Sequence, residues 1–188
     1  IDQFKKKLLE GMQLNGLKEE FAETVFHQIR GFGEYGFPES HAASFALLVY
    51  ASCWIKHHHP DVFCCAMLNS QPLGFYTPAQ LIADAQRHNV EIAPVDLNAS
   101  QWECTLESLD SKRHRVRLGL CMIRGLHQND GLMIATERLS HGPYKDQSQL
   151  VRRCKLGQSI LTILADSGAM SSLSGNRRAA YWQALGQD

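Results

Sequence analysis

The chain has 188 residues, an apolar fraction of 44%, and 19 acidic residues against 19 basic ones. This length and composition predict a globular protein with one compact domain or two small ones. Because the charges balance, the chain is not the strongly basic body that coats nucleic acid, so any contact with DNA must be local.

The residues present do not predict a membrane span or an export signal. No apolar stretch approaches the roughly 18 residues that a membrane span requires, so we expect no membrane partner. Residues 1–7 lack the charged head and apolar middle of a signal peptide, and Ile1 is not a natural initiator. We therefore expect a part of a longer protein.

The metal-binding residue types are not arranged as a metal site. The six cysteines form no CxxC pair and lie mostly in apolar runs, which favours reduced thiols in a cytoplasmic protein; they are Cys53, Cys64, Cys65, Cys104, Cys121 and Cys154. Residues 57–59 are all histidine, but on a helix they point about 100° apart and cannot share one ion well. The aspartates are scattered rather than paired, so we expect no catalytic residue and no metal ligand.

The first half of the chain reads as helical. Apolar spacing predicts helices over residues 4–12 and 17–29, the second ended by the glycines at positions 31, 33 and 36. Ser40 is a good N-cap for a long apolar helix, which Pro60 halts. Shorter helices are predicted over residues 61–68 and, after the cap Thr77, over residues 78–89.

The pattern changes in the second half. Residues 91–106 have an extended character, and Val116 and Leu118 alternate with arginines after a polar turn at 108–113, which predicts a small β-hairpin. Helical signals resume after Gly125, over residues 158–165 and over residues 177–185. The predicted fold class is mainly α.

Two turns could contact phosphate. Residues 123–127 form a turn before a helix, where free backbone NH groups can hold a phosphate oxygen without reading sequence. Residues 167–170 and 173–178 form a second candidate, with Arg177 and Arg178 beside it. Ordinary turns between packed helices are the alternative, and Asp130 argues against phosphate at the first turn.

Two other features admit a functional interpretation. Residues 33–43 place a glycine-rich turn and His41 at the start of the long apolar helix, where an anion or a sugar hydroxyl is favoured, although capping or packing is the commoner role. Phe75, Tyr76 and Trp102 could stack on bases, although aromatic residues near turns more often belong to the core.

The segment from Tyr35 to Leu47, YGFPESHAASFAL, resembles the fingers region of bacterial DNA polymerase III alpha subunits, the C family of polymerases. The resemblance continues through residues 56–63, 67–70, 92–98 and 117–126 and thus covers nearly the whole chain. Replicative members usually carry asparagine and lysine where this chain has Pro38 and Glu39, which resembles the error-prone branch. A replicative alpha subunit is the alternative.

The resemblance implies a domain plan and a nucleotide-facing pocket. Residues 1–98 correspond to a helical fingers segment, residues 99–119 to a β-hairpin connection and residues 120–188 to a tandem helix-hairpin-helix domain. His41 matches the histidine thought to face the sugar of the incoming deoxynucleotide as a steric gate. Four neighbours would shape that pocket: Tyr35, Gly36, Phe37 and Ser40.

The resemblance also implies contacts with primer-template duplex that do not depend on sequence. The residues predicted to bind DNA lie in the two turns: Arg124, Gly125 and Leu126, then Gly175, Asn176, Arg177 and Arg178. At the first turn the family pattern has a small residue where this chain has His127, which puts close backbone approach to phosphate in doubt.

The family's catalytic aspartates and triphosphate-binding residues lie upstream of the matched region. The chain alone is therefore expected to be inactive and to hold no cofactor, with Mg²⁺ acting in the full-length nucleotidyltransferase of damage-induced mutagenesis. Sliding-clamp and mutagenesis accessory proteins would bind through other regions. The alternative from another class is a non-catalytic module that links the polymerase core to accessory regions.

Overall fold

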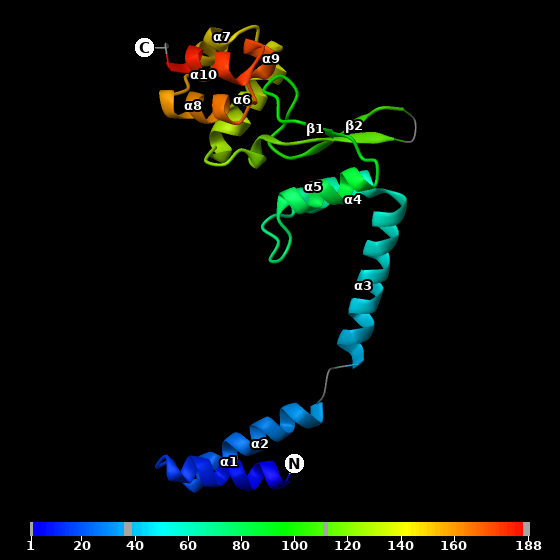
Figure 1. Ribbon diagram of the computed structural model, residues 1–188, viewed down its shortest axis with the longest axis vertical. Helices are drawn as coiled ribbons and strands as arrows, with labels where there is room; N and C mark the ends of the chain where they lie inside the picture. Colours follow the sequence, from blue (N-terminus) through cyan, green and yellow to red (C-terminus); the bar gives the residue numbers. More distant parts are fainter. Residues whose placement is uncertain (1, 36–38, 111–112, 186–188) are drawn as a thin grey trace. The chain divides into compact units, whose positions relative to one another are not determined.

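A computed structural model describes residues 2–35, 39–110 and 113–185, which fall into two compact units, residues 1–51 and 52–188 (Figure 1). The described residues are mainly helical, with one small sheet. This confirms the predicted fold class.

The first unit contains two packed helices, α1 (Asp2–Leu14) and α2 (Glu19–Tyr35). Ala22 and Phe26 of α2 are buried at their contact. The prediction that Gly31 and Gly33 end this helix was wrong, because α2 continues through both of them to Tyr35. An isolated glycine costs a helix only about 1 kcal/mol relative to alanine, which its neighbours can offset.

Helix α3 (Glu39–His58) crosses the division between the units and ends two residues before Pro60, close to the predicted end. It begins one residue before the predicted cap, Ser40. Its large apolar side chains are exposed: Leu47 is 69% exposed and Tyr50 is 70% exposed. A helix that is apolar on all sides is normally buried inside a larger protein.

Two short helices follow in the second unit, α4 (Pro60–Asn69) and α5 (Pro78–Arg87). Thr77 caps α5 through a capping box with Gln80, and each helix has proline at its first position, where no amide hydrogen is required. Both helices were predicted, and their ends lie within two residues of the predicted ends.

The sheet has the strand order β1-β3-β2, with β1 at Ile92–Ala93, β2 at Thr105–Ser108 and β3 at His114–Arg117. Strands β2 and β3 are antiparallel and confirm the predicted hairpin, and β1 adds a parallel neighbour to β3. A small core joins this sheet to α4 and α5; its buried members are Cys64, Cys65, Leu68, Ala85, Val90, Cys104 and Val116.

The rest of the second unit is a cluster of short helices (Figure 1). They are the 3₁₀ turn η1 (Leu120–Met122), α6 (Gln128–His141), α7 (Gln147–Cys154), α8 (Gln158–Asp166), α9 (Ser171–Ser174) and α10 (Arg177–Leu185). A continuous apolar core connects them, and Leu97 of the preceding segment is part of it. The sequence pattern does not predict α7 or the single-turn α9.

Candidate nucleic-acid interface

The turn at residues 123–127 leads directly into helix α6. Gly125 has φ +88°, a conformation that other residues rarely adopt, and a Cβ there would also lie 3.5 Å from the Cδ1 atom of Ile163. Leu126 is only 8% exposed, so its side chain anchors the turn in the core. His127 then takes extended backbone angles, φ −77° and ψ 148°, as the N-cap of α6.

Residues 155–157 repeat this geometry between α7 and α8. Lys155 has φ +49° and ψ 42°, Leu156 is 7% exposed, and Gly157 is the N-cap of α8 with φ −77° and ψ 161°. We call residues 123–127 and 155–157 the first and second hairpins. The sequence interpretation missed the second hairpin because no glycine stands at its left-handed position and because α7 was not recognised.

Neither hairpin provides a side-chain cap for the helix that follows it: His127 and Gly157 make no capping hydrogen bond. Helix α7 does have such a cap, since Asp146 accepts the amide hydrogen of Gln149 at 2.7 Å, whereas α4 and α9 also begin without one. The first amide NH groups of an uncapped helix carry partial positive charge and are suited to phosphate oxygens.

Exposed cations lie at both hairpins. Arg124 is exposed in the first hairpin, and Arg152 and Lys155 are exposed at the second. The neighbouring Arg153 faces inward, where it contacts Glu137 and stacks over the ring of Tyr144 at 4.3 Å. Each hairpin therefore combines an uncapped helix start with a solvent-facing positive charge, which is the chemistry of a sequence-independent phosphate contact. At the first hairpin Asp130, in the first turn of α6, opposes this contact.

The predicted turn at residues 175–178 is arranged differently. Gly175 has φ +77° and ends α9, and the Oδ1 atom of Asn176 accepts the amide hydrogen of Ala179 at 2.8 Å. Asn176 thus caps α10 with its own side chain. Arg177 lies 3.7 Å from a carboxylate oxygen of Asp166, and Arg178 is exposed.

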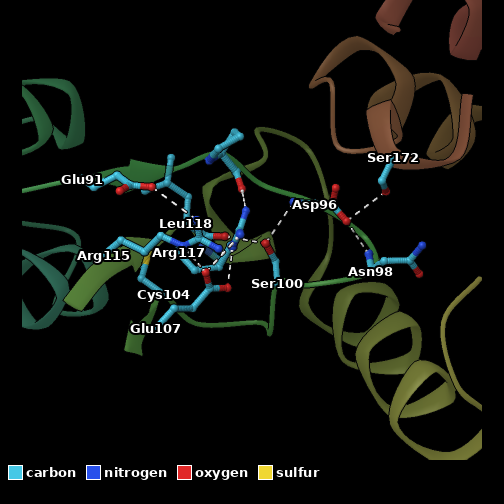
Figure 2. Close-up of polar contacts among 12 residues, drawn as sticks. Glu91, Asp96, Asn98, Ser100, Cys104, Glu107, Arg115, Arg117, Leu118 and Ser172 are labelled. Atoms are coloured by element: carbon cyan, nitrogen blue, oxygen red, sulfur yellow. Dashed lines mark hydrogen bonds and ion pairs between the residues drawn. The ribbon is translucent and has the colours of Figure 1, made fainter. Parts of the chain in front are cut away.

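The segment before β2 holds the helical cluster by polar contacts. Arg138 of α6 is buried and donates from Nη1 to the carbonyl oxygens of Leu97 and Ser100, each at 2.7 Å. Asn98 exchanges two hydrogen bonds with the backbone of Tyr144. Figure 2 shows Asp96 receiving the hydroxyl of Ser172 from α9, at 3.0 Å.

The sheet beside this segment is fixed by an ion-pair network. Glu107 accepts hydrogen bonds from Arg117 at 2.8 Å and from Arg115 at 2.5 Å (Figure 2). The hydrogen bond from Arg117 is the main reason that the pKa of Glu107 lies below its usual range. These contacts fix the position of the sheet relative to the segment at 94–100, because Arg117 also donates to the carbonyl oxygen of Pro94 at 2.7 Å.

The predicted nucleotide-facing residues lie around the junction of α2 and α3. His41 is exposed in the first turn of α3, with its ring centroid 4.4 Å from that of Phe45. Tyr35 is the last residue of α2 and Ser40 lies in α3. Gly36 and Phe37 lie outside the described residues. The pocket that these residues would shape stays a prediction.

In the described part of the chain, no three His, Cys, Asp or Glu side chains are grouped so that they could hold a metal ion. The six cysteines are free thiols. None of the helices described combines the length and the apolar character needed to cross a membrane.

Comparison with known proteins agrees with this arrangement. The family model described as a helix-hairpin-helix motif matches residues 89–180, a range that contains both hairpins and the segment that holds them. The match begins just before β1.

The chain is also similar along its whole length to longer proteins. It is 56% identical over 189 aligned positions to the error-prone DNA polymerase of Rhodopirellula baltica, which covers 100% of this chain and 16% of that protein. The error-prone DNA polymerases of Alkalilimnicola ehrlichii and Azoarcus are 53% and 51% identical, over 98% and 99% of this chain and 18% of each relative. The chain thus spans less than a fifth of the length of these relatives. From this agreement over all its elements, we conclude that the chain belongs to the family of the error-prone DNA polymerases.

Proposed function

We propose that this chain is the part of an error-prone DNA polymerase that contacts the primer-template duplex through the two hairpins. The observation that carries the proposal is the repeat itself: a left-handed residue, a buried leucine and an uncapped helix start occur at both Gly125 and Lys155. Two uncapped helix N-termini on one core can bind backbone phosphates without contacting bases.

The turn at residues 175–178 belongs to the same proposal as an outlying contact. Arg178 is exposed and can reach a phosphate, whereas Arg177 already faces Asp166 and Asn176 satisfies the start of α10. We therefore assign the larger share of duplex affinity to the hairpins and a smaller share to this turn.

The proposal keeps the domain plan that the resemblance implies. Residues 1–98 would be the fingers segment, 99–119 the connection and 120–188 the tandem helix-hairpin-helix domain. In that plan His41 faces the sugar of the incoming deoxynucleotide and Tyr35, Gly36, Phe37 and Ser40 surround it. The place of His41 in the first turn of α3 supports this role.

The complete enzyme would transfer nucleotides to a DNA primer in the bacterial cytoplasm, tolerate lesions, use Mg²⁺ and bind clamp and accessory proteins elsewhere. The described residues do not fit a magnesium site, since they contain no group of carboxylates that could hold the ion. We therefore derive no chemical step from them and expect this chain alone to be inactive.

The alternative, a non-catalytic linking module, is favoured by the exposed apolar side chains of α3, which are suited to protein contact. The two functions differ in their response to salt. Phosphate contacts release counterions, so duplex affinity carried by hairpins falls steeply with salt concentration, whereas a linking module has no such affinity.

The test is fluorescence anisotropy of a labelled duplex with three double variants, each of which removes two positive charges. Arg124→Ala with Lys155→Ala should flatten the salt dependence by about 0.9 in log–log slope for each lost contact. Lys6→Ala with Lys7→Ala, on exposed positions of α1, is the matched control and should bind like the unaltered chain. Arg177→Ala with Arg178→Ala should have the smaller effect; an effect larger than that of the hairpin variant would contradict the assignment.

A further inference from the structure

The three aromatic residues that the sequence suggests for base stacking differ in how far they are exposed in the structure. Trp102 is packed against α6, because a Cβ atom on Gly131 would lie 2.4 Å from its ring. Phe75 is 94% exposed and Tyr76 is 60% exposed. Of these three residues, the adjacent pair in the loop therefore presents aromatic faces to a ligand.

The loop that carries this pair joins α4 to α5 and projects from the two helices (Figure 1). It is braced from within: the side chain of Gln71 accepts the amide hydrogen of Leu73 at 3.0 Å, and that of Gln80 accepts the amide hydrogen of Thr77 at 2.9 Å. The two aromatic rings are thus displayed on a structured loop, although their exposure costs the isolated chain favourable burial.

A cavity of about 420 Å³ lies beside the loop, and Tyr76 forms part of its wall. Lys56 and Arg87 are its two cations, at 2.7 Å and 3.4 Å from the single carboxylate of Asp84. Since two cations face one anion, the site has an excess positive charge, and the side chain of Arg87 is 75% exposed. Aromatic faces beside cations are the combination that single-stranded nucleic acid requires.

We propose that Phe75 and Tyr76, with Arg87 and Lys56, bind single-stranded DNA: the rings stack on unpaired bases and the cations hold the phosphates. The proposal deepens the proposed function, because a polymerase that holds duplex through its hairpins meets an unpaired template strand beside it. An apolar peptide is the competing ligand, but the excess positive charge would not contribute to its binding. The experiment distinguishes an apolar peptide from single-stranded DNA.

The experiment measures binding of labelled oligothymidylate, and of an abasic oligomer of equal length, to the whole chain. Phe75→Ala should weaken oligothymidylate binding about tenfold, in line with the contribution of one stacked base, and leave abasic binding unchanged. Phe75→Trp should keep the affinity and show quenched tryptophan fluorescence on binding. Phe75→Leu, which keeps an apolar side chain without a π-face, should behave like Phe75→Ala.

Three results would overturn the proposal: equal oligothymidylate affinity in Phe75→Ala, full affinity in Phe75→Leu, or abasic binding as tight as oligothymidylate binding. Full affinity in Phe75→Leu would indicate an apolar peptide-like contact. Because Phe75 is almost fully exposed, its variants should melt at the temperature of the unaltered chain. The Arg124→Ala, Lys155→Ala variant should have weaker duplex affinity but unchanged oligothymidylate affinity, so the failure of either proposal is seen by itself.

Discussion

At the scale of single residues, two glycines with similar backbone angles have opposite requirements. Gly119 and Gly157 both lie in extended backbone, with φ −78° and −77°. A Cβ atom on Gly119 would lie 2.3 Å from the carbonyl carbon of Glu103 and 2.4 Å from the carbonyl oxygen of Trp102, whereas one on Gly157 would meet nothing within 4 Å. Space, and not conformation, fixes glycine at position 119.

We predict that Gly119→Ala destabilises the chain by about 3 kcal/mol, because the backbone of residues 102–104 cannot move without disturbing the core. Gly157→Ala is the matched control and should change stability by less than about 0.5 kcal/mol. Urea unfolding followed by circular dichroism measures both. If Gly119→Ala were as stable as Gly157→Ala, residues 102–104 could move away from position 119 without cost, which would contradict the prediction.

Acid should weaken the fold through Glu107. Its pKa is lowered by hydrogen bonds from Arg117 and Arg115, so the stabilisation is complete above the ordinary glutamate pKa of about 4.3 and is lost as pH falls through the folded value. Glu107→Gln should therefore lower the unfolding free energy at pH 7 and reduce its change between pH 5 and pH 3. Urea titrations across that range provide the test. If the unfolding free energy of the variant fell as much between pH 5 and pH 3 as that of the unaltered chain, the prediction would be contradicted.

At the scale of elements, the sequence predicts those helices whose apolar spacing or caps are strong, such as α5 with its cap Thr77. It does not predict α7, although Asp146 and Gln149 carry a cap signal, because α7 has only eight residues, several of them polar. It also does not predict β1, since a two-residue strand depends on its partner β3 and has no pattern of its own.

Helix α3 is the opposite case. Its apolar residues predict a buried helix, but their side chains are exposed in the described structure. Leu47→Glu with Tyr50→Glu should reduce the binding of a hydrophobic dye and raise solubility, because both side chains are exposed. The melting temperature of the second unit should not fall, since both positions lie in the first unit. A large fall would show that α3 is packed in solution.

At the scale of the whole molecule, a neutral net charge is compatible with DNA binding because few charges are needed where helix starts already present amides. The sequence was sufficient to predict the first hairpin, where glycine marks the left-handed residue. It was not sufficient for the second, where a lysine, Lys155, takes that conformation next to the buried Leu156. The nucleotide-facing role of His41 stays a prediction, because residues 36–38 lie outside the described chain.

The central claim is that the start of α8, which has no side-chain cap, holds phosphate, and Gly157→Asp tests it most directly. An aspartate there would cap α8 and place a negative charge where phosphate is proposed to bind, so stability should rise by roughly 0.5 kcal/mol while duplex affinity falls at least about tenfold. Gly157→Asn, which caps without charge, should stabilise similarly and lose less affinity. Duplex affinity of Gly157→Asp measured by anisotropy decides the matter: a loss of affinity in a more stable protein is the predicted result, and affinity equal to that of the unaltered chain would contradict the account.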